Sequence, residues 1–310
     1  MSYIVQTDGL TKTIQDKDLV QDINIHVKKG EIYGFLGPNG AGKTTVMKLI
    51  TNLWKPSKGT ITLFGRPLTA KSYDIYKRMG SIIEFPTFYE NLSGRENLKL
   101  HCAYMGYHHP SGITSVLELL HIADAADKPV RNYSLGMKQR LGIARAILCK
   151  PELLILDEPI NGLDPAGIKQ IRNLLKTLCT EYGTTMIVSS HILSEVEFIA
   201  DTIGIIAGGK LLQEIPMQEI IEMNAAYIEL KTANLNYTAC LLADKLQLTN
   251  FKVMDDAAIR IYDKNCSPQQ ISDLLAQHQI AIHTIYTKAD TLEDYFLKLI
   301  TEEMPYADFN

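Results

Sequence analysis

A short glycine-rich segment constrains the fold of this chain more than any other feature. It reads Gly37-Pro38-Asn39-Gly40-Ala41-Gly42-Lys43-Thr44, in which two glycines bracket four residues and are followed by a lysine and a hydroxyl residue. This spacing is typical of a phosphate-binding loop, whose backbone N–H groups curl around an anion. Gly40 and Gly42 permit that curl because they have no Cβ atom. The segment therefore predicts a strand–loop–helix unit that binds phosphate.

The residues on either side of the loop favour the same interpretation. Residues 31–36 are predicted to form a buried strand, and residues 45–53 a helix. The phosphates would then lie at the N-terminus of that helix, where free N–H groups and the helix dipole favour negative charge. Lys43 would bring its ammonium to the β- and γ-phosphates, and the Thr44 hydroxyl would bind Mg²⁺. A chance glycine-rich turn is the alternative.

Length and composition limit the class of protein. The chain has 310 residues, of which 46% are hydrophobic and 21% are charged, and its net charge is −4. We expect one large or two smaller folded domains, and no nucleic acid as a bulk partner. No apolar run approaches the roughly 18 to 20 residues of a membrane span, and residues 1–8 lack the layout of a signal peptide. We therefore expect a cytosolic protein whose five scattered cysteines are free thiols.

The hydrophobic pattern changes character along the chain. Up to about residue 216, short apolar runs alternate with amphipathic stretches, and this predicts an α/β domain with a largely parallel sheet. One of its predicted strands covers residues 23–27. After about residue 225, short strands and helices predict a small α+β domain. We therefore divide the chain into residues 1–224 and 225–310. An extension without its own core is the alternative for the second part.

A second site is predicted where two acidic residues follow an apolar strand. Residues 153–156 are all apolar, and Asp157 and Glu158 come next. Burying an unpaired charge is costly, and a metal ion would remove that cost. Asp157 would hold Mg²⁺ opposite Thr44, and Glu158 would orient or deprotonate the water that attacks the γ-phosphate. A solvated turn, or Asp157 as a helix N-cap, is the alternative.

Three further segments resemble the motifs of ATP-binding-cassette (ABC) ATPases. Tyr133-Ser134-Leu135-Gly136-Met137-Lys138-Gln139 resembles the signature motif, Asn161-Gly162-Leu163-Asp164 the D-loop, and Ser189-Ser190-His191 the switch histidine region. Their order, spacing and flanks match over about residues 2–216. The resemblance implies a P-loop NTPase cassette with ATP and Mg²⁺ as ligands. It assigns the whole loop to nucleotide binding together with Thr45, and Glu158, His191 and Lys43 to catalysis.

The same resemblance implies that the ATP site is shared between two subunits. In the family, the signature helix of one subunit caps the γ-phosphate held by the other, so that two ATP molecules lie in a head-to-tail dimer. Ser134 and Gly136 would therefore act on the partner's nucleotide. A serine that only caps its own helix is the alternative for Ser134. His191 would hydrogen-bond the γ-phosphate or the attacking water, and an ordinary surface histidine is the alternative.

A narrower group within the family also resembles this chain. Its members are the ATPases of bacitracin exporters and of lantibiotic self-protection exporters, and the similar segments cover residues 82–92, 134–146 and 292–300. The resemblance implies export of a peptide antibiotic through a separate membrane permease, with this chain on the inner face of the membrane. Residues 85–98 would contact the permease through Phe85, Phe88 and Tyr89. Packing of these aromatics in the core is the alternative.

Two positions depart from the usual pattern of the family. Glu84 stands where most members have a glutamine that reaches the Mg²⁺ and the water, as it does in the lantibiotic-protection group. We assign it to the metal and nucleotide site, and expect it to tune coupling to the permease. A solvent-facing strand end is the alternative. Ile14 stands where the family stacks an aromatic ring on adenine, and it can pack on the base without offering a π-face. Tyr3 is a possible substitute.

Two other functions remain open on the sequence alone. A regulatory or sensory ATPase would signal the presence of an antibiotic without powering its export. An ABC ATPase that acts on ribosomes or DNA usually has two cassettes or long coiled-coil insertions, whereas this chain has one phosphate loop and no heptad run.

Overall fold

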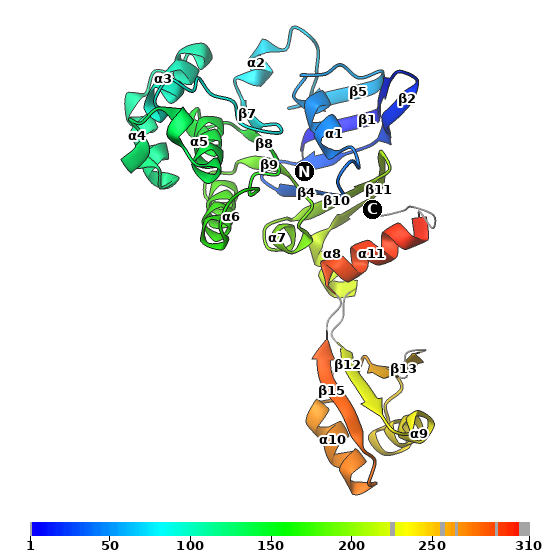
Figure 1. Ribbon diagram of the computed structural model, residues 1–310. Coiled ribbons are helices and arrows are strands. Elements are labelled where there is room, and N and C mark those ends of the chain that lie inside the picture. The colour runs from blue at the N-terminus through cyan, green and yellow to red at the C-terminus, as the bar shows by residue number, and fades with distance from the viewer. Residues whose placement is uncertain (1, 224–226, 255–257, 264–265, 289–290, 304–310) are drawn as a thin grey trace. The chain divides into compact units, whose positions relative to one another are not determined.

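The computed structural model describes residues 2–223, 227–254, 258–263, 266–288 and 291–303 (Figure 1). It divides into two compact units, the first comprising Met1–Met217 with Leu299–Asn310 and the second Gln218–Lys298. The predicted division lay at residue 224 and assigned every later residue to the second domain. The structure instead divides at Met217 and groups the chain from Leu299 with the first unit.

A six-stranded sheet forms the centre of the first unit. Its order is β11-β10-β4-β9-β8-β7, in which the strands from β10 to β7 are parallel and β11 pairs antiparallel with β10. The bounds are β4 (Ile32–Leu36), β7 (Met79–Ile82), β8 (Leu153–Asp157), β9 (Thr185–Ser190), β10 (Thr202–Ala207) and β11 (Lys210–Pro216). Every residue of β4, β8, β9 and β10 is buried, as strands covered on both faces require. The predicted parallel α/β core is confirmed.

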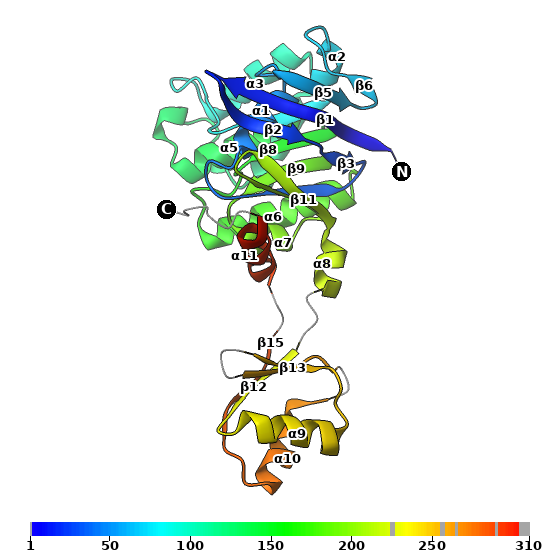
Figure 2. The same ribbon diagram turned by 90° about the vertical axis from the view of Figure 1, so that its right-hand side faces the viewer.

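A second, antiparallel sheet completes this unit (Figure 2). It contains β1 (Tyr3–Ile14), β2 (Lys17–Ile23), β3 (His26–Lys28), β5 (Lys58–Leu63) and β6 (Arg66–Pro67). The predicted strand over residues 23–27 was wrong, because β2 ends at Ile23 and β3 begins at His26. The Asn24 side chain causes the break: its amide donates to Asp22 O at 3.1 Å, and its carbonyl oxygen accepts from Gly9 N–H at 2.7 Å.

Helices cover the central sheet, and α3, α4 and α5 gather on one side of the unit (Figure 1). The bounds are α1 (Lys43–Ile50), α2 (Tyr73–Tyr76), α3 (Gly94–Met105), α4 (Pro110–Leu119), α5 (Leu135–Leu148), α6 (Pro165–Thr180) and α7 (Leu193–Glu197). A further helix, α8 (Met217–Met223), begins at the last residue of the first segment and otherwise belongs to the second unit. Side chains cap three of the N-termini. Ser93 and Glu96 form a capping box on α3, Ser134 caps α5, and Asp164 caps α6.

The alternation of side chains along each central strand divides the core into two clusters. Leu154 and Leu156 face a cluster formed with α3, α4, α5 and α6. Leu153 and Ile155 face the opposite cluster, which includes Met47 of α1 and the second sheet. The carboxyl ends of β4, β8 and β9 therefore come together at one edge of a sheet that is held on both faces.

The second unit has an antiparallel sheet of order β13-β14-β12-β15. The bounds are β12 (Tyr227–Thr232), β13 (Phe251–Met254), β14 (Ala258–Ile261), β15 (Ile282–Lys288), α9 (Leu235–Leu246) and α10 (Pro268–Gln277), and α11 (Leu292–Glu303) follows. Leu230, Leu242, Ile259 and Leu275 are buried in a cluster made only of residues from this unit. The unit thus has its own core. In the part of the chain that the structure describes, no helix has both the length and the apolar character to span a membrane.

Candidate active site

The glycine-rich loop forms a tight cradle between β4 and α1. Gly40 and Gly42 have φ angles of 79° and 110°, in the region that side chains disfavour. A Cβ atom on Gly42 would lie 2.6 Å from Val20 Cγ1, and one on Gly37 would lie 2.3 Å from the Ile206 carbonyl oxygen. Glycine is therefore required at 37 and 42 by the backbone and side chains that surround the loop. The helix that begins at Lys43 directs its N-terminus at this cradle.

Lys43 extends back across the loop. Its Nζ atom donates to Gly37 O at 2.6 Å and to Pro38 O at 3.2 Å, and it lies 3.7 Å from Glu158 Oε1. The side chain is 6% exposed. Burial lowers the pKa of Lys43, and the nearby Glu158 and Asp157 carboxylates oppose that shift. The arrangement places a desolvated ammonium where a polyphosphate bound in the cradle would meet it.

Asp157 is the centre of a buried hydrogen-bond network at the end of β8. Its Oδ2 atom accepts from Thr44 Oγ1 at 2.7 Å and from Glu84 N–H at 3.3 Å, and its Oδ1 atom accepts from Ser189 Oγ at 2.6 Å. Asp157 is 2% exposed, and α6 begins only after Asp164. The structure therefore differs from both alternatives for Asp157, the solvated turn and the helix N-cap.

Glu158 and His191 form a pair beside the loop. Glu158 has a positive φ of 49°, and its N–H donates to Ser189 Oγ at 2.9 Å. This backbone conformation turns the Glu158 carboxylate toward Lys43 and His191, whose Nδ1 atom lies 2.8 Å from Glu158 Oε2. The structure thus brings Lys43, Glu158 and His191 together. The imidazole contacts the carboxylate, and the contact of His191 with the γ-phosphate or the attacking water stays a prediction.

Glu84 is held differently from the expectation. It has a positive φ of 59°, its side chain is 56% exposed, and its Oε1 atom lies 2.6 Å from Lys48 Nζ. Only its backbone N–H contacts Asp157. The structure therefore pairs the Glu84 carboxylate with Lys48, and the Glu84 backbone N–H makes the contact to Asp157. Sequence reasoning missed Lys48 because a lysine on a helix surface is an ordinary residue.

Ile14 and Tyr3 lie at opposite ends of β1. Both are exposed, and the 11 residue steps between them span at most about 36 Å at about 3.3 Å each. Lys12 pairs with Val20, which lies against Gly42, so the Ile14 end of the strand is the end near the loop. Tyr3 contacts the His26 ring at a centroid distance of 5.5 Å. The geometry keeps Ile14 as the candidate for packing on the base and removes Tyr3.

The signature segment lies at a different place in the same chain. Ser134 caps α5 by accepting from Met137 N–H at 3.2 Å, and a Cβ atom on Gly136 would lie 3.4 Å from Gly162 O. The cavity of about 730 Å³ beside Ser134 is lined by residues between His121 and Gln170. None of the lining residues belongs to Gly37–Thr44. Ser134 is thus a helix cap, as the alternative held, and it also borders an open cavity.

Two polar residues that sequence reasoning did not assign hold the site together. Ser189 bridges the Asp157 carboxylate and the Glu158 N–H, as described above. Gln139 of α5 is 4% exposed, and its Nε2 atom donates to Pro159 O at 2.9 Å. This bond joins the signature helix to the segment that follows β8. Both residues lie inside motifs quoted from the sequence, but their partners come from other elements.

The expected permease-facing segment is divided between surface and core. Phe85 and Tyr89 are 74% and 58% exposed. Phe88 is half-buried against the core, and the Arg145 guanidinium lies 4.9 Å from its ring centroid. Phe85 and Tyr89 are therefore exposed, as a contact with the permease would require, whereas Phe88 packs against the core as the alternative held.

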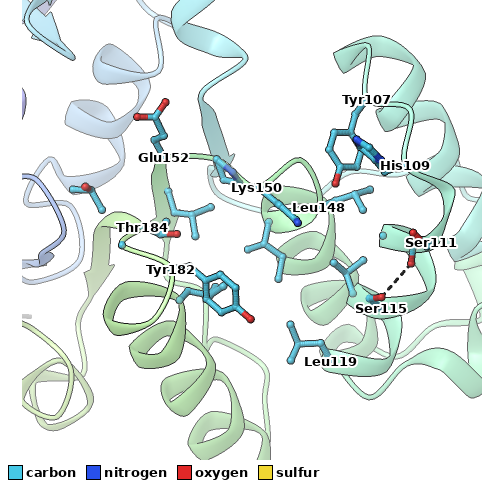
Figure 3. A pocket seen from close by; sticks show the side chains of 18 of the residues that line it. Tyr107, His109, Ser111, Ser115, Leu119, Leu148, Lys150, Glu152, Tyr182 and Thr184 are labelled. Atoms are coloured by element: carbon cyan, nitrogen blue, oxygen red, sulfur yellow. Dashed lines mark hydrogen bonds between the residues drawn. The ribbon is translucent and has the colours of Figure 1, made fainter.

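A larger cavity, of about 920 Å³, lies elsewhere in the first unit (Figure 3). Figure 3 shows Tyr107, His109 and Ser111 on one wall and Tyr182 on another. The lining reaches Thr185 at the beginning of β9, whereas Asp157 and Ser190 lie at the carboxyl ends of their strands. It includes none of the predicted site residues, so size alone does not identify the active site here.

Comparison with known proteins identifies relatives over nearly the whole chain. The ABC transporter family model matches residues 20–161. An uncharacterized ABC transporter ATP-binding protein, YcbN of Bacillus subtilis (strain 168), is 54% identical over 97% of this chain and 98% of its own. The bacitracin transport ATP-binding protein BcrA of Bacillus licheniformis is 44% identical over the same shares. The lantibiotic transport ATP-binding protein SrtF of Streptococcus pyogenes is 41% identical over 68% of this chain and 90% of its own.

A solved structure of an ATP-binding subunit of an ABC transporter has the same fold. It matches with a TM-score of 0.65 at 27% identity, and the match covers 71% of this chain and 92% of that one. The identity to its relatives over nearly the full length shows that this chain belongs to the ABC transporter ATP-binding proteins and is an ATPase.

Proposed function

We propose that this ATPase powers the export of a peptide antibiotic of the bacitracin class through a separate membrane permease. The observation that carries the substrate class is the identity to BcrA together with the extent of that similarity. BcrA matches the chain through both units, whereas SrtF matches 211 residues, fewer than the 217 that open the first unit. The second unit is therefore a feature that this chain shares with the bacitracin protein more than with the lantibiotic one.

ATP would bind with its phosphates in the cradle of Gly37–Thr44. Lys43 and the N-terminus of α1 would face the β- and γ-phosphates, with Thr45 at the same helix end, and Ile14 would pack on the base. These contacts use groups whose positions are set before the nucleotide arrives. Such preorganisation limits the ordering cost of binding.

The residues present fit a magnesium ion. Thr44 Oγ1 and Asp157 Oδ2 are 2.7 Å apart, and both are hard oxygen ligands at the edge of the cradle. Among the described residues there is no group of three or more His, Cys, Asp or Glu side chains that would hold a metal. Thr44 and Asp157 would therefore share the ion with phosphate oxygens, as Mg²⁺ sites commonly do. When bound, the ion would neutralise charge on the β- and γ-phosphate oxygens.

Glu158 would act as the general base for the attacking water. Its Oε1 atom faces Lys43 and its Oε2 atom contacts His191, so both oxygens of the carboxylate have a neighbour that holds them beside the cradle. The Ser189 contact to the Glu158 N–H fixes the backbone that carries this side chain. His191 would orient the carboxylate and complete the site beside the γ-phosphate.

We further propose that two copies of the chain close on ATP. Ser134 and Gly136 border a cavity separate from the loop, so each chain carries two half-sites that a head-to-tail dimer would join. The exposed Phe85 and Tyr89 would contact the permease at the inner face of the membrane. The chain would then lie on the cytoplasmic side, and the antibiotic would contact only the permease.

The test is antibiotic susceptibility in cells that express this chain with the permease encoded beside its gene. We expect the pair to raise the minimum inhibitory concentration of bacitracin and to reduce cell-associated bacitracin. Glu158→Gln should abolish both effects, whereas Glu181→Gln, the same change at an exposed residue after α6, should preserve them. Protection against lantibiotics alone would contradict the substrate class. Signalling to a resistance promoter without any change in cell-associated drug would instead support the sensory alternative.

A further inference from the structure

An ion pair between Lys48 and Glu84 joins the phosphate-binding helix α1 to the segment that follows β7. Lys48 lies one helical turn after Thr44 on α1, and its side chain is 18% exposed. Glu84 follows β7 and opens the segment that contains Phe85 and Tyr89. The contact of 2.6 Å between Lys48 Nζ and Glu84 Oε1 therefore ties the phosphate-binding helix to the start of the exposed aromatic segment.

Trp54 completes this cluster. Lys48 Nζ lies 4.7 Å from the Trp54 ring centroid, within the range of a cation–π contact. Lys12 Nζ lies 5.9 Å from the same ring and donates to Lys55 O at 2.8 Å. The indole therefore supports the ammonium of Lys48 from one side while Glu84 accepts its hydrogen bond. Trp54 is also the single tryptophan of the chain.

The backbone and the side chain of Glu84 are held by different groups. Its N–H donates to Asp157 Oδ2, the oxygen that also accepts from Thr44. The backbone is thus fixed at the edge of the magnesium site whatever the side chain does. A free carboxylate at this position would repel a bound polyphosphate. Lys48 removes that repulsion by drawing the carboxylate to its own ammonium.

We propose that Lys48 is a positioning residue that holds the Glu84 carboxylate away from the phosphates and links α1 to the segment that begins at Phe85. This inference rests on the proposed magnesium and ATP site. It would let a carboxylate stand where the family usually has glutamine without repelling the phosphates. It also assigns Trp54 as an internal reporter, because any change at Lys48 alters the charge beside its ring.

The first test measures affinity for a non-hydrolysable ATP analogue with Mg²⁺ by calorimetry. Because an exposed ion pair contributes up to about 1 kcal/mol, Lys48→Met should weaken binding by about three- to fivefold. The double variant Lys48→Met with Glu84→Gln should return to within about twofold of the original protein, because it has no carboxylate left to repel the phosphates. Arg95→Met, which breaks the 2.8 Å ion pair between Arg95 of α3 and Asp127, is the matched control and should bind normally.

The outcomes separate the two proposals. If Lys48 only stabilised its helix, the double variant would bind as weakly as Lys48→Met, and that result would overturn the positioning role. Unchanged binding in Lys48→Met would overturn it as well. A failure of the original protein to bind the analogue at all would instead contradict the proposed nucleotide site.

The second test uses the fluorescence of Trp54 without nucleotide. Glu84→Gln should shift the Trp54 emission, because the Lys48 ammonium beside the ring loses its partner. In Lys48→Met the same Glu84→Gln change should leave the emission unaltered. In the Lys12→Met variant, adding Glu84→Gln should still shift the Trp54 emission. This control removes a different cation from beside the ring and keeps the Lys48–Glu84 pair. If Glu84→Gln shifted the Trp54 emission equally in the presence and in the absence of Lys48, the proposed link from Glu84 through Lys48 would be refuted.

Discussion

Ser189 provides a sharp test of how the two acidic residues are held. It is completely buried, its hydroxyl donates to Asp157 Oδ1 at 2.6 Å, and it accepts from Glu158 N–H at 2.9 Å. Ser189→Ala removes a hydrogen bond to a buried charge, which contributes about 1.5–3 kcal/mol, and leaves the Glu158 N–H without its acceptor. Since Asp157 keeps its contacts to Thr44 and Glu84, we expect a loss of about 2–4 kcal/mol in the free energy of unfolding.

The neighbouring Ser190 is the matched control. It is equally buried, but its hydroxyl accepts from Ile192 N–H at 2.9 Å and donates to Ile192 O at 3.2 Å, both neutral and local. Ser190→Ala should therefore cost about 1 kcal/mol. Urea unfolding followed by circular dichroism gives the stabilities, and the rate of ATP hydrolysis should fall only for Ser189→Ala. If Ser189→Ala and Ser190→Ala lost equal stability and hydrolysed ATP at equal rates, the proposed role of Ser189 in holding the two acidic residues would be refuted.

Three further predictions concern the loop, the signature helix and the half-buried His101. Gly42→Ala should abolish binding of the ATP analogue, because its Cβ atom would meet Val20, whereas Gly40→Ala meets no atom within 4 Å and should only weaken binding; calorimetry of both variants tests this. Gln139→Leu should reduce stability by about 1–2 kcal/mol in urea unfolding and slow hydrolysis, because Pro159 O loses its donor; an unchanged rate would contradict the link from α5. Burial and Arg145 lower the pKa of His101 from 6.5 to about 4, so the unfolded chain binds more protons between these values and stability should fall as pH drops from 6.5 toward 4. In His101→Gln this decline should be smaller, and identical declines in the two proteins would exclude the effect.

Much of the fold was predictable where one periodicity dominates a segment. The strand predicted over residues 31–36 overlaps β4, and the helix predicted over residues 45–53 overlaps α1, because each is an unbroken apolar or amphipathic run. The break between β2 and β3 was not predictable, since it depends on Asn24 meeting Gly9 from another strand. The short helix α2 was missed because four residues carry too little helical pattern to be recognised.

The site was predictable where residues share a motif and unpredictable where they meet only in space. Gly37–Thr44 and the acidic pair are recognised by local spacing, and parallel strands bring their ends together. The direction of the Glu84 side chain depends on Lys48, which lies 36 residues earlier on a different element. The contact between Glu158 and His191 spans 33 residues and required the register of β8 with β9. Long-range partners of this kind leave no periodic signal in the sequence.

The central claim is that each ATP is held between the loop of one chain and Ser134 of another. It is tested most directly by the molecular mass of the Glu158→Gln variant in solution with ATP and Mg²⁺, because a shared site requires a dimer. Removing the general base should slow hydrolysis by about 10²–10⁴-fold and so preserve the ATP-bound state. Sedimentation should then show a species of twice the 34.7 kDa chain mass with ATP, and the chain mass alone without it. A variant that stays at 34.7 kDa with ATP bound, while the unmodified chain hydrolyses ATP as a monomer, would contradict the shared site.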